Sequence, residues 1–202
     1  MKSPSEMSRA RILAECALMV AMSVVLSMLP SVSLPFGGSV SWFSTLPVIA
    51  VSLRHGVRWG ILAALVYSIT QLLLGMANVA AVPAGTAGAM VLCALLDYVI
   101  AYSALGLTGA VARGLGRGAV GVAAGIAFTG AIRLLCSFLS GVLIWGAYAP
   151  EGTSVWAYSL GYNASWCVPD VLITLIGAVL LSRVRSLSLV GQSAARRGRA
   201  DV

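Results

Sequence analysis

The chain has 202 residues, of which 59% are hydrophobic and only 9% are charged, and its mean hydropathy is +0.97. Soluble domains carry about 25% charged residues, so this composition excludes a soluble surface and indicates an integral membrane protein. The net charge of +7 is compatible with nucleic-acid binding. However, the basic residues are spread along the chain and form no single patch, which favours a role in setting membrane orientation.

Six apolar segments predict an all-α membrane protein with six transmembrane helices. They are Ala10–Leu29, Leu46–Leu53, Gly60–Gly75, Gly88–Val111, Ala119–Trp145 and Tyr158–Ser182. The first resembles a signal peptide but lacks a small-residue cleavage site followed by a polar chain, so we interpret it as a retained helix. The second is too short to cross a core of about 30 Å at ~1.5 Å per residue. It must extend towards Trp42 or be a partial span packed inside the protein.

The arginines predict the topology. Basic residues precede the first helix, join the second to the third and the fourth to the fifth, and follow the sixth. By the positive-inside rule these segments are cytoplasmic, with both termini inside. We therefore expect a cytoplasmic segment at 1–9, a membrane domain at 10–185 and a basic, disordered cytoplasmic tail at 186–202.

Small residues on two helices predict close helix packing. Ala14, Ala17 and Ala21 share one face of the first helix, which is typical either of packing within the protein or of a docking face for a partner membrane protein. Gly121 and Gly125 form a GxxxG pattern on the fifth helix, which we interpret as internal packing.

Polar side chains inside the spans are candidates for a binding site, because they are costly in a membrane. Asp97 lies in the fourth helix and Ser137 in the fifth, while Asn163, Trp166 and Asp170 share one face of the sixth. A carboxylate, an amide, hydroxyls and aromatic rings suit a flat heteroaromatic cation. Alternatively, the aromatic residues are belt residues at the membrane interface. The spacing leaves open whether Asp97 or Asp170 faces the cavity.

Arg133 is the basic residue inside a span, and we expect it to pair with Asp97 or Asp170, although snorkelling or a role in the site stays open. The four cysteines lie in apolar runs without metal-ligand spacing, and we expect them to be buried. Phosphate-loop, HExxH and GxSxG motifs are absent, and neither aspartate lies in a GxGD setting. We therefore expect no catalytic residues, metal or cofactor, and a protein that is not an enzyme.

Two hexapeptides, Trp145–Pro150 (WGAYAP) and Tyr158–Asn163 (YSLGYN), resemble the thiamine-specific substrate-binding (S) components of energy-coupling factor (ECF) transporters. Ala17–Ala21 is similar to the AxxxA contact of that family's first helix, and Leu53–Gly56 to its LRRG-like turn. The resemblance extends from about Ala10 to Arg183.

This resemblance implies a vitamin-uptake subunit in a prokaryotic cell membrane that captures thiamine from outside. Its partners would be a transmembrane coupling protein and two cytoplasmic ATPases that supply the energy for import. By position, the implied partner-docking residues are Ala14, Ala17 and Ala21. The implied substrate-binding residues are Asp97, Tyr98, Ser137, Trp145, Tyr158, Asn163 and Trp42.

Two positions depart from the family pattern. Ser137-Phe138 stands where a histidine precedes phenylalanine, and Asp97 replaces a glutamate. These changes leave open whether the ligand is thiamine, one of its phosphates or precursors, or another small heteroaromatic molecule. A structural membrane subunit that binds no ligand is the alternative from a different class.

Overall fold

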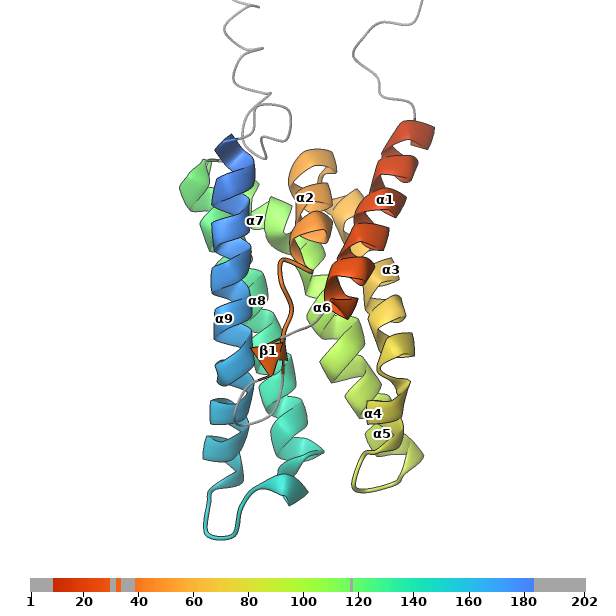
Figure 1. The fold of residues 1–202 in the computed structure, drawn as a ribbon, viewed down its shortest axis with the longest axis vertical. Coiled ribbons are helices and arrows are strands. Elements are labelled where there is room, and N and C mark those ends of the chain that lie inside the picture. The colour runs from red at the N-terminus through yellow and green to blue at the C-terminus, as the bar shows by residue number, and fades with distance from the viewer. Residues whose placement is uncertain (1–8, 30–31, 34–38, 117, 184–202) are drawn as a thin grey trace, which may run out of the picture.

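The computed structural model describes residues 9–29, 32–33, 39–116 and 118–183, which form an elongated helical bundle (Figure 1). Within these ranges, five helical segments are long and apolar enough to cross a membrane. They are α1 (Arg9–Met28), α3 (Val57–Leu74), a composite fourth span (Ala87–Gly114), α8 (Ala119–Leu143) and α9 (Val155–Arg183). Their outer faces are apolar, with large side chains such as Leu73 and Leu180 exposed. The predicted tail at 186–202 and residues 1–8 lie outside the described part of the chain.

The second predicted helix, α2 (Leu46–His55), is a partial span packed inside the protein, the second of the two alternatives open from the sequence. Ten residues at ~1.5 Å each cover about half of a ~30 Å membrane core. Every residue from Leu46 to Ser52 is buried. Gly56, with φ +93°, then turns the chain into α3.

The segment between α1 and α2 contains a short antiparallel pair of strands that the sequence did not predict, β1 (Val32–Ser33) and β2 (Ser39–Val40). A short helix, α4 (Met76–Ala80), follows α3. The start of α1, the α2–α3 junction, the α7–α8 junction and the end of α9 lie at one end of the bundle (Figure 1). The positive-inside topology requires this arrangement, while the six-span count and the side of each terminus stay predictions.

The fourth span is not the regular helix that the sequence predicted. It consists of α5 (Ala87–Cys93), the π-helical η1 (Ala94–Ile100), α6 (Ala101–Ser103), the 3₁₀-helical η2 (Ala104–Leu107) and α7 (Thr108–Gly114). Its C-terminal part packs tightly on α2, where the Ser52 hydroxyl donates to the Gly106 carbonyl at 2.5 Å and accepts from the Gly109 N–H at 2.9 Å. This contact with α2 is not visible in the hydrophobic pattern of the fourth span.

Close packing also joins α8 to α7. A Cβ atom at Gly121 would lie 2.7 Å from the carbonyl oxygen of Ala112, and one at Gly125 would lie 2.6 Å from that of Thr108. The internal packing predicted for this GxxxG pattern is therefore confirmed. The prediction that the cysteines are buried is also confirmed for all four.

Candidate functional site

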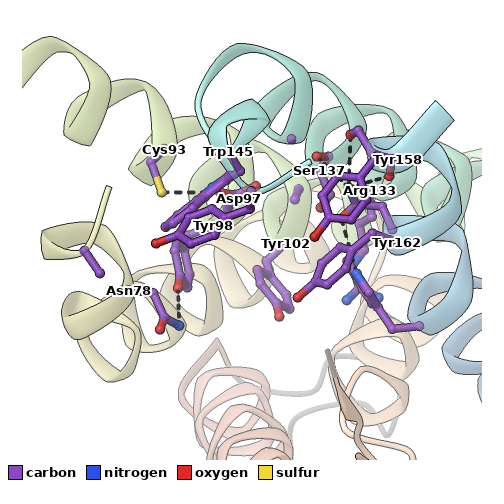
Figure 2. A pocket seen from close by; sticks show the side chains of 17 residues that line it. Asn78, Cys93, Asp97, Tyr98, Tyr102, Arg133, Ser137, Trp145, Tyr158 and Tyr162 are labelled. Atoms are coloured by element: carbon purple, nitrogen blue, oxygen red, sulfur yellow. Dashed lines mark hydrogen bonds between the residues drawn. The ribbon is translucent and has the colours of Figure 1, made fainter. Parts of the chain in front are cut away.

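A cavity of about 670 Å³ is lined by the fourth span, α8, α9, the α8–α9 connection and Asn78 of α4 (Figure 2). Its volume is within the range of about 300–1,000 Å³ that is typical of small-molecule sites. Six of the seven residues predicted to bind substrate line this cavity. They are Asp97, Tyr98, Ser137, Trp145, Tyr158 and Asn163.

The Asp97 carboxylate is held by three donors and has no salt-bridge partner in the described part of the chain. Its Oδ2 accepts hydrogen bonds from Ser140 Oγ at 2.7 Å, Trp145 Nε1 at 3.3 Å and Cys93 Sγ at 3.3 Å. None of the salt bridges among the described residues involves Asp97. Asp97 lies in the π-helical η1, and such irregular turns occur frequently at functional sites. The carboxylate is therefore oriented by hydrogen bonds while its charge remains unpaired.

Trp145 lies two residues after the end of α8 and presents an aromatic face next to this carboxylate. The Ile144 N–H donates to the Ser140 carbonyl at 2.8 Å, which closes the last turn before the indole. The orientation of the indole ring is therefore fixed by the backbone of this turn and by the hydrogen bond that the indole N–H donates to Asp97. Tyr148 lies beside it, with ring centroids 6.0 Å apart and an interplanar angle of 32°. The pair forms an aromatic wall of the cavity next to the α8–α9 connection.

Asn163 is largely used in joining α9 to α8. Its amide nitrogen donates to the Ser137 carbonyl at 3.1 Å and to the Ser159 carbonyl at 2.9 Å, while its Oδ1 accepts from Trp166 Nε1 at 3.2 Å. Two carbonyl partners require the NH₂ group on that side, so the orientation of the amide is determined. An approaching ligand would therefore find one remaining lone pair of Oδ1. Gly141 permits this close contact, since a Cβ there would collide with Ser159 Oγ.

Hydroxyl groups complete the wall. Tyr98 Oη donates to the Gly75 carbonyl and accepts from Asn78 Nδ2, each at 3.4 Å. Tyr158 and Tyr162 lie one turn apart on α9 with ring centroids 6.1 Å apart, and Figure 2 shows both beside the cavity. These long hydrogen bonds and half-buried rings leave the phenol groups available to a ligand.

Arg133 pairs with Asp170, one of the two acids that the sequence left open. Arg133 Nη1 lies 2.6 Å from Asp170 Oδ2, and both side chains are buried. The guanidinium carbon lies 4.9 Å from the ring centroid of Tyr102 and 5.6 Å from that of Trp166. Asp97, and not Asp170, lines the large cavity.

Trp42 and the alanine face lie apart from the cavity. Trp42 is 45% exposed and does not line it, so its role in covering a ligand stays a prediction. Ala14, Ala17 and Ala21 are exposed, whereas Cys16 on the same helix is buried. In the described part of the chain, the alanine face is therefore not used for packing within the protein.

Sequence reasoning missed Tyr102 and Asn78 as lining residues. Tyr102 lies five residues after Asp97, a spacing that points away from Asp97 in a regular α-helix but towards it where the turn is widened by i→i+5 bonding. Asn78 belongs to the short helix α4, within a segment read as a loop. No signal in the sequence identified either feature.

The family model described as "Thiamine transporter protein" (Thia_YuaJ) matches residues 13–189. The thiamine transporter ThiT of Bacillus subtilis is 33% identical over 180 residues, which cover 84% of this chain and 88% of that protein. ThiT of Lacticaseibacillus paracasei is 31% identical over 146 residues, covering 66% and 68% of the two chains.

A solved structure of ThiT from Listeria monocytogenes has a TM-score of 0.70 at 24% identity and covers 91% of this chain and 99% of its own. This likeness supports the all-helical membrane fold. The relatives are bacterial transport proteins, and together with the apolar spans they identify a multi-pass membrane protein of a prokaryote. The chain belongs to the thiamine transporter protein family.

Proposed function

We propose that this chain is the substrate-binding component of a vitamin importer and captures thiamine from the outer side of the membrane. The observation that carries the proposal is the Asp97 carboxylate, which faces an aromatic cavity without a cationic partner among the described residues. A buried negative charge is costly unless it is paired. A permanently cationic ligand would supply the missing charge.

Thiamine matches the chemistry of this cavity. It consists of an aminopyrimidine ring joined to a cationic thiazolium ring that carries a hydroxyethyl arm. Trp145 offers a face for stacking and for a cation–π contact, while Tyr98, Tyr158 and the Ser137 hydroxyl offer hydrogen-bonding groups for ring nitrogens and the amino group. Asp97 provides the counter-charge for the thiazolium.

We further propose that the chain works with a transmembrane coupling protein and two cytoplasmic ATPases of an ECF module. The sequence contains no phosphate-binding loop that would hydrolyse ATP. The exposed face of Ala14, Ala17 and Ala21 allows the close approach of another helix. Energy and the final release step would then come from the partner proteins.

Tryptophan fluorescence of the purified protein tests this function. Thiamine that stacks on Trp145 should quench the emission saturably, and Trp145→Phe should remove most of that response. Trp156→Phe is the matched control, because Trp156 is 59% exposed and packs on Phe138 outside the cavity. A titration that includes thiamine, its phosphates, its pyrimidine half and riboflavin defines the ligand class. A structural subunit would respond to none of these compounds, and that result would refute the proposal.

A further inference from the structure

A second cavity of about 300 Å³ borders the first, and we name it the annex. The two cavities share part of their walls, including Tyr102, Arg133 and Trp166. The remaining wall of the annex is polar: Gln71 Nε2 donates to Ser27 Oγ at 2.8 Å, and further hydroxyl groups lie around them. The annex can therefore accept a small polar group that extends from a ligand in the large cavity.

The buried pair of Arg133 and Asp170 forms the boundary of the annex. Asp170 Oδ2 occupies Arg133 Nη1 at 2.6 Å, while the Arg133 Nε–H has no hydrogen-bond acceptor among the described residues. The rings of Tyr102 and Trp166 flank the guanidinium and restrict its movement. The guanidinium is thus fixed at the wall of the annex, and its positive charge is cancelled by the adjacent Asp170 carboxylate.

The charges of the two cavities therefore differ. The large cavity holds the unpaired negative charge of Asp97. Arg133 lines both cavities, but its charge is neutralised by Asp170, which lines the annex and not the large cavity. A hydroxyl group suits a neutral polar site, because its oxygen can accept from an amide such as that of Gln71 and its hydrogen can be donated to a neighbouring hydroxyl group. A phosphate ester brings a charge of about −1.5 to −2 at pH 7 and would meet the Asp170 carboxylate. The burial of that anion without a free cation is costly.

We propose that the annex is the subsite for the uncharged polar arm of the ligand, and that Asp170 is the residue that makes this subsite reject a phosphorylated arm. This inference rests on the proposed function, since thiamine carries a hydroxyethyl arm that becomes charged in its monophosphate. Asp170 acts through Arg133 as a specificity-determining residue. It differs in role from Asp97, which faces the cationic ring.

Binding measurements on the wild-type protein separate charge from size. The dissociation constants of thiamine, its O-acetyl ester and its monophosphate are compared by tryptophan quenching. The acetyl ester is an uncharged extension of similar bulk, so it should bind within about threefold of thiamine, whereas the monophosphate should bind at least about tenfold more weakly. Equal rejection of both esters would show that size is the determinant and would overturn the inference.

Asp170→Asn then tests the residue. It leaves Arg133 with an uncancelled charge, so the preference for thiamine over the monophosphate should fall by at least about tenfold, which is ~1.4 kcal/mol. Asp97→Asn is the matched control: it removes a carboxylate beside the ring shared by both ligands, so both affinities should fall while their ratio changes little. An unchanged ratio in Asp170→Asn would overturn the inference. If that variant does not fold, the wild-type comparison of the two esters still decides. A wild-type protein that binds none of the three compounds would instead refute the proposed function.

Discussion

Asp97→Asn is the substitution that most directly tests the proposed role of the cavity. The amide oxygen can replace Oδ2 and keep its hydrogen bonds from Ser140, Trp145 and Cys93, while the NH₂ group replaces Oδ1. The change therefore removes the charge and preserves the shape. Loss of one partner from a buried charge pair costs about 2–5 kcal/mol. Because Asp97 is only partly buried, we expect about 2–3 kcal/mol, or roughly a thirtyfold to 150-fold loss of thiamine affinity.

The assay is the dissociation constant of thiamine and of an analogue in which an uncharged ring replaces the thiazolium. The charged ligand should lose affinity and the neutral one should lose much less, while the unfolding temperature stays close to that of the wild type. Glu151→Gln is the control, since it makes the same chemical change at an exposed residue after the α8 span. Equal weakening of both ligands, or an unchanged affinity for thiamine, would refute the assignment of Asp97 as counter-charge.

Three further predictions concern packing, docking and transport. Gly141→Ala should weaken ligand binding or stability by about 1–3 kcal/mol, because the added methyl group collides with α9. The control variant Gly161→Ala should be tolerated, because a Cβ atom there meets nothing within 4 Å. If binding and unfolding assays show the same loss for both variants, the packing argument is wrong. Ala17→Trp and Ala21→Trp should block co-purification with the coupling protein and leave thiamine binding intact. The control variant Val120→Trp, on the exposed surface of α8, should assemble normally. Loss of ligand binding in the two alanine variants would refute docking on that face. Vesicles that contain this chain alone should bind thiamine without accumulating it, and ATP-dependent uptake by such vesicles would contradict the need for a separate energy module.

The span positions could be predicted from the sequence because hydrophobic length is a local property. A membrane helix satisfies its own backbone hydrogen bonds, so an apolar run of about 20 residues is sufficient evidence for a span. The segments at α1, α3, α8 and α9 follow this rule within a few residues. The rule does not apply to α2, which is short and whose residues from Leu46 to Ser52 are buried by its neighbours. It also misses the π-helical and 3₁₀-helical turns of the fourth span.

The candidate site also has a part that the sequence predicted and a part that only the packing of the helices decided. The residue types alone, an acid, an amide, hydroxyls and aromatic groups in three spans, predicted a cavity for a flat cation and part of its lining, while Trp145 and Tyr98 came from the family resemblance. Which acid carries the free charge depends on a contact between helices: Arg133 on α8 reaches Asp170 on α9 and leaves Asp97 unpaired. The inward direction of Tyr102 depends on the widened turn of η1. Composition and periodicity therefore determined the membrane fold and the kind of ligand. The pairing of Arg133 with Asp170, 37 positions apart in the sequence, was decided by the packing of α8 on α9, because no local preference of either residue selects its partner.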